Sequence, residues 1–295
     1  MTATTLATPI AQQRFFWPAL FILMWSSGYV AGKVGLPYAG PFTLIFIRFV
    51  SAALVLLLVT LLTRAPWPTR PMTYVHLAVV GLLVQALQFS GLYLGLSLGV
   101  SAGISALIVG MMPIFTAVGA IVVLHEKVTR QQVLGLMVGL FGVSIVVLDK
   151  IGVGHAQWSG YAAILLALTG ITAGTLYQKK FVTQIDLRTG GFIQLGIASL
   201  AVAPIAILSE NLSVIWTPAL IGASAWLSLV NSIGAVSVLF LMMRRGEATK
   251  VAGLFYLIPS ATAFMGYLVL GETLTTLQLF GFFVSATGVY LTTRH

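Results

Sequence analysis

Long apolar runs, separated by short polar or proline-containing segments, make up most of the sequence. A helix that crosses the hydrocarbon core of a bilayer needs about 20 predominantly apolar residues. Ten runs of about this length can be marked: Phe15–Leu36, Phe42–Leu62, Thr73–Gly95, Ala102–Leu124, Gln131–Leu148, Ser159–Gln178, Thr189–Leu208, Ala219–Met243, Lys250–Leu270 and Leu274–Thr293. The pattern therefore predicts an all-α polytopic membrane protein with ten transmembrane helices, five in each half of the chain.

The second half of the chain repeats the first half at a fixed offset of 146 positions. Identical residues that meet at this offset include Pro113 and Pro259, Leu124 and Leu270, Glu126 and Glu272, Gln132 and Gln278, and Gly142 and Gly288. Each copy predicts an apolar helix with a proline near its middle, a turn that carries one glutamate, and a glycine-rich apolar helix. Because an internal repeat usually decides the fold, we expect two five-helix units, residues 1–149 and 150–295.

The composition also indicates a lipid environment. Hydrophobic residues make up 59% of the chain and charged residues 7%, whereas soluble proteins carry about 25% charged residues. The net charge of +9 does not indicate nucleic-acid binding, because the basic residues occur singly or in pairs between apolar runs and form no clustered basic face. Cysteine is absent, which excludes disulfides and thiolate metal sites, and no G-x-x-x-x-G-K-[ST] phosphate loop is present. We therefore predict no cofactor.

Positive charge is distributed unevenly between the two predicted sides of the membrane. Five helices per unit is an odd number, so the second unit enters the membrane upside down relative to the first. Of the 15 Lys and Arg residues, 12 fall on the side that holds both termini, and Lys33, Arg48 and Lys150 fall on the other side. Cytoplasmic loops are enriched in Lys and Arg, so we predict an inner-membrane protein with both termini in the cytoplasm. Inverted-topology repeats are typical of transporters that alternate access around a midplane site.

The two halves resemble the paired EamA repeats of the drug/metabolite transporter superfamily. The resemblance is carried by the motif P-x(10)-L-x-E before the last helix of each half, at Pro113, Leu124 and Glu126 and again at Pro259, Leu270 and Glu272. It covers nearly the whole chain, and within the superfamily the chain is most similar to bacterial YddG-type exporters of aromatic amino acids. The resemblance implies a small-molecule substrate and a central cavity lined by helices 1, 3, 4, 6, 8 and 9, with helices 5 and 10 outside.

Three carboxamides lie deep in predicted helices, and they are candidates for contact with the substrate. Gln85 in the third helix meets Asn231 in the eighth at the repeat offset, and Gln88 lies one turn beyond Gln85. A carboxamide in hydrocarbon is costly unless it is hydrogen-bonded, and polar groups inside membranes tend to be functional. We expect these side chains to contact the substrate or a gate. Hydrogen bonding between helices, worth about 0.6 kcal/mol per bond, is the structural alternative.

Pro113 and Pro259 lie halfway along their predicted helices. Proline removes one backbone hydrogen bond and frees the carbonyls near Val109 and Phe255. We expect both prolines to act as hinges, with the freed carbonyls available to a substrate ammonium group. A fixed kink is the alternative, because prolines are frequent in membrane helices.

Aromatic residues within the helices are further candidates for the substrate site. Trp25, Trp226 and Tyr256 lie deep in helices 1, 8 and 9, although packing against lipid is an equally acceptable position for each. Tyr93 also supplies an aromatic ring and a hydroxyl within its helix, and an interfacial aromatic belt is the alternative position for it. Arg48, about two turns into helix 2, is expected to extend toward the outer headgroups, with a substrate carboxylate as its alternative partner.

Two further groups of residues have structural roles in this interpretation. Glu126 and Glu272 occupy turns, where we expect each to cap the helix that follows. Gly135, Gly139 and Gly142 form a small-residue face that suits helix packing within one subunit as well as between two. The pattern therefore does not require an oligomer.

These features favour a carrier embedded in the lipid bilayer over an enzyme or a channel. None of the six carboxylates falls in mid-helix, whereas ion-coupled carriers usually hold an ionisable group at depth. We therefore expect facilitated diffusion of hydrophobic or aromatic amino acids and related metabolites, with a proton-coupled drug/metabolite exporter and a channel as alternatives. Ser105 lies in a G-x-S pattern like that of an intramembrane serine protease, but the candidate bases, His76 and His125, lie near membrane surfaces.

Overall fold

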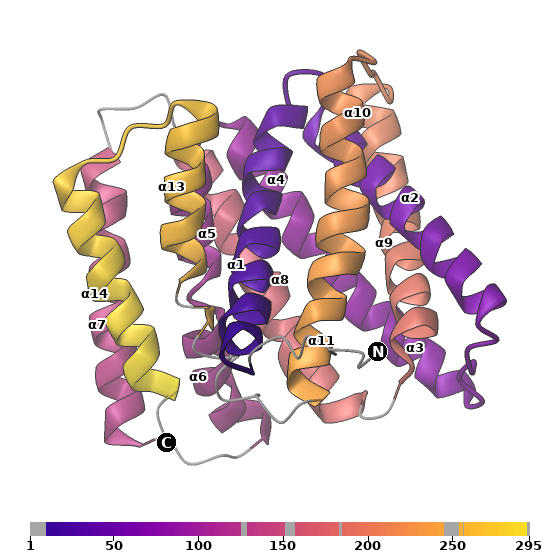
Figure 1. Ribbon diagram of the computed structural model, residues 1–295, viewed down its shortest axis with the longest axis horizontal. Helices are drawn as coiled ribbons and strands as arrows, with labels where there is room; N and C mark the ends of the chain where they lie inside the picture. Colours follow the sequence, from indigo (N-terminus) through magenta and orange to yellow (C-terminus); the bar gives the residue numbers. More distant parts are fainter. Residues whose placement is uncertain are drawn as a thin grey trace, which may run out of the picture.

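The computed structural model describes residues 10–124, 129–150, 157–182, 185–244, 254–255 and 257–293. Within these ranges the chain is almost entirely helical (Figure 1), and β structure is limited to an isolated antiparallel bridge between Ala39 and Val214. The described elements overlap the predicted apolar runs, so the hydropathy pattern predicted helix correctly where the structure describes the chain; residues 250–253, at the start of the ninth run, lie outside the described ranges.

The helices of the first half are α1 (Ile10–Gly35), α2 (Pro41–Leu62), α3 (Pro71–Val80), η1 (Gly81–Leu87), α4 (Gln88–Ser97), α5 (Ala102–Val109), α6 (Met112–Leu124) and α7 (Arg130–Lys150). Those of the second half are α8 (Trp158–Phe181), α9 (Leu187–Glu210), α10 (Pro218–Ala225), η2 (Trp226–Ala235), α11 (Val236–Arg244), α13 (Ile258–Leu270) and α14 (Thr276–Thr293). Five segments are long and apolar enough to cross a membrane: Pro41–Leu62, Pro71–Ser97, Trp158–Phe181, Leu187–Glu210 and Pro218–Leu239. Together with the shorter apolar helices, they make the chain a multi-pass membrane protein.

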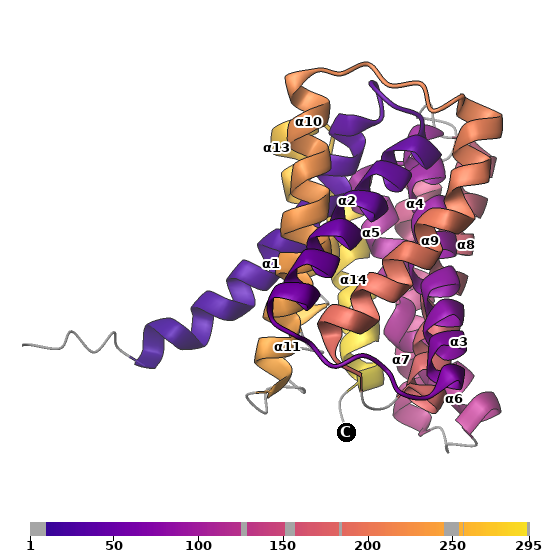
Figure 2. The same cartoon turned by 90° about the vertical axis from the view of Figure 1, so that its right-hand side faces the viewer.

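The turns gather at two opposite ends of the helix bundle. The turns before α2, α5, α10 and α14 lie at the end drawn uppermost in Figure 1, which we call the upper end, and the loop between α2 and α3 lies at the lower end. The first part of α1 projects from the side of the bundle (Figure 2). At the start of α9, Asp186 accepts a hydrogen bond from the Arg188 amide, and hydrogen bonds from the Arg188 side chain lower the pKa of this carboxyl below its ordinary value. This helix therefore begins with a charged cap.

Two π-helical segments interrupt the third and eighth runs, where the sequence pattern predicted regular α-helix. The segments are η1 and η2, and the offset of 146 places Gly81–Leu87 inside the range of η2. Gln85 and Asn231 therefore both lie on widened turns. π-Helical turns are rare and often occur at functional sites. Their occurrence at equivalent places in both halves therefore makes these turns candidates for a functional role.

The helix predicted over Ala102–Leu124 is broken, which corrects the expectation of a continuous helix with proline in its middle. α5 ends at Val109 and α6 begins at Met112, so Pro113 stands at the start of the second piece. The cause is steric, because the proline ring has no N–H and clashes with the carbonyl four residues earlier. Pro259 likewise stands in the first turn of α13, after a turn in which the Leu257 amide bonds to the Leu254 carbonyl at 3.0 Å.

The glycine-rich helices α7 and α14 pack side by side at one edge of the bundle (Figure 1). A Cβ atom on Gly288 would overlap the backbone of Gly139, and one on Gly142 would overlap the backbone of Ser285. The small-residue face predicted on Gly135, Gly139 and Gly142 therefore packs within the subunit. Close approach of the two backbones stabilises membrane helices, since van der Waals packing replaces the hydrophobic effect there.

We expect Gly288→Ala to lower the apparent melting temperature of the detergent-solubilised protein by several degrees. The added methyl group would meet backbone atoms that cannot move aside, and overpacking of this kind costs about 1–3 kcal/mol. Gly222→Ala is the matched control, because a Cβ atom there has no neighbour within 4 Å. Equal melting temperatures for the two variants would contradict the packing described here.

Candidate functional site

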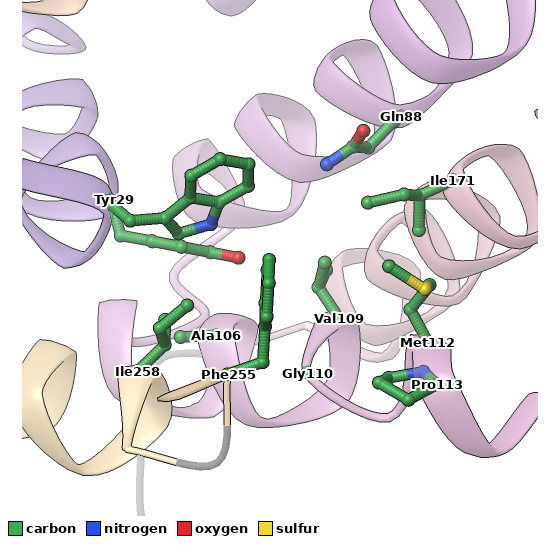
Figure 3. A pocket seen from close by; sticks show the side chains of 11 residues that line it. Tyr29, Gln88, Ala106, Val109, Gly110, Met112, Pro113, Ile171, Phe255 and Ile258 are labelled. Carbon is green, nitrogen blue, oxygen red and sulfur yellow. The ribbon is translucent and has the colours of Figure 1, made fainter. Parts of the chain in front are cut away.

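A pocket lies where α1, α4 and α8 meet the two broken helices (Figure 3). Its walls are Trp25 and Tyr29 of α1, Gln88 of α4, Ala106, Val109, Gly110, Met112 and Pro113 around the first break, Ile171 of α8, and Phe255 and Ile258 at the second break. Of the helices that the family resemblance implies, the first, third, fourth, sixth and ninth contribute to these walls. The eighth contributes no residue to them, and neither do α7 and α14, the fifth and tenth.

Equivalent residues from the two halves of the chain line the pocket together. Six of its wall residues form three pairs at the offset of 146 positions: Trp25 with Ile171, Val109 with Phe255, and Met112 with Ile258. The two breaks also touch, because a Cβ atom on Gly110 would lie 3.1 Å from Cγ of Pro259. The equivalent discontinuities of both halves therefore build one shared site.

The walls are mostly apolar and aromatic, with a few polar groups directed inward. Trp25 and Phe255 contact each other edge to face at 5.5 Å between ring centroids. Figure 3 shows the Tyr29 hydroxyl and the Gln88 amide pointing into the space between the side chains. Both side chains are buried. Apolar walls with a few fixed polar groups are the usual composition of a small-molecule site.

Asn231 and Gln85, the symmetric pair of carboxamides, do not line this pocket. The Asn231 amide donates a hydrogen bond to the Met24 carbonyl, and Gly28 leaves room for it beside α1. This contact ties η2 to α1, as the structural alternative for Asn231 anticipated. Gln85 is half-buried on η1, and the prediction that it contacts substrate or a gate stays a prediction.

The remaining predicted site residues occupy different environments. Trp25 lines the pocket, whereas Trp226 is 45% exposed and its indole nitrogen donates to the Ser27 hydroxyl at 2.8 Å. Pro113 lines the pocket, whereas Pro259 does not line it and packs against the lining residue Gly110. Tyr256 lies outside the described residues.

Arg48 does not extend toward the outer headgroups, and that expectation is wrong. Its side chain is buried inside the bundle, where Nε donates to the Ser232 hydroxyl at 3.0 Å and Nη1 donates to the Tyr93 hydroxyl at 3.1 Å. Tyr93 is fully buried, which excludes the interfacial belt that was the alternative position for it. A polar cluster around a cation therefore lies in the interior of the helix bundle.

Glu272 closes the upper end of the bundle, in place of the expected role as a cap for α14. One of its carboxylate oxygens pairs with Lys33 Nζ at 2.6 Å and accepts a hydrogen bond from the Ala102 amide at 2.9 Å. It thus caps α5 and links the upper ends of α1, α5 and α13. The start of α14 is capped by Thr275, whose hydroxyl accepts from the Gln278 amide. Glu126, the equivalent glutamate of the first half, lies outside the described residues.

The chemistry required for the protease alternative is not assembled in the part of the chain that the structure describes. Ser105 is fully buried, and its hydroxyl has no hydrogen-bond partner among these residues. His76 instead bonds through Nδ1 to the Tyr177 hydroxyl at 2.8 Å. His125 falls outside the described ranges. The described His, Asp and Glu side chains also form no group of three or more that could hold a metal ion.

Comparison with known proteins identifies the family. The profile of the EamA-like transporter family matches the chain twice, over residues 15–148 and 158–294. The chain belongs to the EamA-like transporter family. The two repeats that the sequence pattern predicted are therefore EamA repeats, which are characteristic of a family of transporters.

Relatives of this EamA protein include transporters from several bacteria. It is 28% identical over 281 residues to the uncharacterized transporter YvbV of Bacillus subtilis, a match that covers 92% of this chain and 89% of YvbV. It is 24% identical to a protein of Escherichia coli K12 named probable amino-acid metabolite efflux pump, with 92% of each chain covered. One solved crystal structure superposes with a TM-score of 0.63 at 16% identity, covering 95% of this chain and 96% of that one. That likeness supports the fold alone.

We expect Gln88→Leu and Asn231→Leu to have different effects. Gln88→Leu removes a polar group of the pocket, so it should weaken ligand binding and transport while the melting temperature stays near that of the native protein. Asn231→Leu removes the bond to the Met24 carbonyl, so it should mainly lower the melting temperature. Flux in liposomes and thermal unfolding, measured on both variants, test this assignment. An unchanged flux in Gln88→Leu would contradict a role for Gln88 in the site.

Proposed function

We propose that the protein is an inner-membrane carrier that exports hydrophobic or aromatic amino acids, and related small metabolites, by alternating access. The family membership and the amino-acid efflux pumps among its relatives support this class of substrate. The pocket supports it as well, since Trp25 and Phe255 offer aromatic faces and Tyr29 and Gln88 offer hydrogen bonds. Aromatic rings pack favourably edge to face. Similarity to the YddG-type exporters points to the same substrates.

In this proposal ten helices cross the membrane as two units, residues 1–149 and 150–295, with opposite orientations. The upper end of Figure 1 then faces outward, because it carries Lys33 and few other basic residues, and both termini are cytoplasmic. Lys33 and Glu272 close the outer side. The odd number of helices per unit and the charge distribution support this arrangement.

The observation that carries the mechanism is the pocket of paired equivalent residues at two touching helix breaks. Unsatisfied backbone groups are tolerated at membrane depth only where they are enclosed by protein or line a cavity. The carbonyls released near Val109 and Phe255 meet this condition, and they can accept hydrogen bonds from the ammonium group of an amino acid. Because the breaks belong to oppositely oriented units, each can act as the hinge for one side of the membrane.

Transport in this proposal is facilitated diffusion. All six carboxylates of the sequence lie in loops or at helix ends, and among the described spans none carries an acidic side chain at the depth of the pocket. Proton-coupled transporters usually hold an acidic side chain inside the membrane, where it takes up and releases the proton. The substrate gradient therefore supplies the driving force.

Purified protein in liposomes should equilibrate labelled tryptophan or phenylalanine without any ion gradient, and the flux should saturate. Ile171→Trp, which adds a second indole to the pocket wall, should reduce this flux about tenfold or more by filling the pocket. Leu165→Trp on the same helix is the matched control, because Leu165 is 53% exposed on the bundle surface. Accumulation driven by an imposed proton gradient would favour the proton-coupled alternative, and a flux that rises without saturation would favour a channel.

A further inference from the structure

Arg48 is a buried cation whose surroundings are polar but not acidic. The residue is 5% exposed. Its guanidinium group donates to Ser232 and Tyr93, and its central carbon lies 4.1 Å from the centre of the Phe89 ring. The Ser51 and Ser228 hydroxyls, 2.6 Å apart, continue the polar surroundings between α2 and η2. Three elements thus contribute to the cluster: α2, α4 and η2.

The positive charge of Arg48 is not neutralised by any residue that the structure describes. The ion pairs between described residues join Lys33 to Glu272 and Arg188 to Asp186. A charge inside a membrane protein is costly, and such charges usually pair or mark the path of a substrate. The hydroxyls and the Phe89 ring compensate part of this cost.

The guanidinium group also retains donors for a further partner. Arginine has five N–H groups in a planar fork, and hydrogen bonds to described residues use one at Nε and one at Nη1. Nη2 donates to no described residue, and it is not among the fully enclosed atoms that lack a partner. An anion that approaches this nitrogen would satisfy donors that the protein leaves open.

The cluster is absent from the equivalent place in the other half. At the offset of 146 positions, Arg48 corresponds to Gln194, Tyr93 to Leu239, Ser51 to Ile197 and Ser232 to Ala86. The second half builds the same helices without a cation there. The architecture of the repeat therefore does not require Arg48, and its charge calls for a different explanation.

Tyr29 connects the cluster with the pocket. Its ring forms part of the pocket wall. One turn further along α1, Gly32 packs against Tyr93 of the cluster, because a Cβ atom there would lie 3.1 Å from the Tyr93 hydroxyl that accepts from Arg48. Gln88, which also lines the pocket, immediately precedes Phe89 of the cluster. The cluster therefore borders the pocket on the side of Tyr29 and Gln88.

We infer that Arg48 binds the carboxylate of the transported molecule, and that the carrier selects aromatic compounds that bear a carboxylate over otherwise identical compounds that lack one. This inference deepens the function proposed above and rests on it for the choice of ligand. The planar fork of arginine matches the two oxygens of a carboxylate, and charge-assisted bonds of this kind are about twice as strong as neutral ones. The aromatic ring then lies in the pocket beside Trp25 and Phe255.

The test compares three ligands that share an indole ring. Tryptophan has an ammonium group and a carboxylate, tryptamine lacks the carboxylate, and indole-3-acetate lacks the ammonium group. Binding by purified protein, measured as ligand-induced thermal stabilisation and as competition for labelled tryptophan, and flux in liposomes are recorded for the native protein and for Arg48→Gln, Arg48→Lys and Arg70→Gln. Glutamine is the residue that the second half carries at the equivalent position, and Arg70 is an exposed arginine whose removal controls for the lost charge.

Arg48→Gln should weaken the binding of tryptophan and of indole-3-acetate about tenfold or more and leave the binding of tryptamine unchanged. Arg70→Gln should not change the binding of any of the three ligands. Arg48→Lys keeps the charge without the planar fork, so it should lose part of the preference for a carboxylate. If Arg48→Gln does not fold, the preference of Arg48→Lys for ligands with a carboxylate tests the inference instead: a reduced preference supports it and an unchanged preference overturns it. An equal loss for all three ligands, or no loss, in a folded variant would overturn the inference and leave Arg48 as a tie between helices.

The same measurements separate this inference from the proposed function. If the native protein carries neither tryptophan nor phenylalanine but binds indole-3-acetate in a manner that depends on Arg48, the proposed function fails and the carboxylate site stands. If tryptophan flux is saturable and identical in the native protein and in Arg48→Gln, the carboxylate site fails and the proposed function stands. Absence of binding for every carboxylate overturns both.

Discussion

Proline has no amide hydrogen to offer the carbonyl one turn earlier, and in this protein that missing bond occurs at two equivalent places, Pro113 and Pro259. Pro113 stands at the start of α6, after α5 has ended at Val109, and Pro259 stands in the first turn of α13. Open backbone groups at this depth have to be enclosed by protein or face a cavity, and here the breaks meet each other through Gly110 and Pro259 and form the walls of one pocket. The position of the pocket between the two helix breaks follows from this constraint.

The surrounding helices are held by contacts suited to lipid, where apolar side chains gain little from meeting one another. Backbones approach closely at glycines, most clearly where α7 meets α14. Polar side chains link helices at single points, such as Asn231 with the Met24 carbonyl and Glu272 with Lys33 and the Ala102 amide. These contacts are few and local. In the proposed mechanism, such a bundle opens at one end while its opposite end stays packed.

The sequence pattern predicted the positions of the helices, the repeat and the family, because apolar length and internal identity are local properties of the chain. It did not predict the π-helical turns around Gln85 and Asn231 or the full break before Pro113, which depend on how neighbouring helices satisfy the backbone. It also misplaced Arg48, although the buried residues of α2 recur every three to four positions on the face that includes Leu44, Ile45 and Ala52. The partner of Glu272 was missed because Lys33 and Ala102 are distant in sequence. Once Trp25, Val109 and Met112 are known to line the pocket, the offset of 146 positions leads to their three partners in the second half, Ile171, Phe255 and Ile258.

The claim that the pocket opens alternately to the two sides is tested most directly by locking the upper end. In Lys33→Cys/Glu272→Cys, both members of the ion pair are replaced in a chain that has no other cysteine, and a flexible reagent with a cleavable disulfide can join the two new thiols. The account predicts that the cross-linked protein binds ligand but transports none, and that reductive cleavage restores the flux of the unlinked variant. Flux that continues at the same rate with the cross-link in place would contradict it.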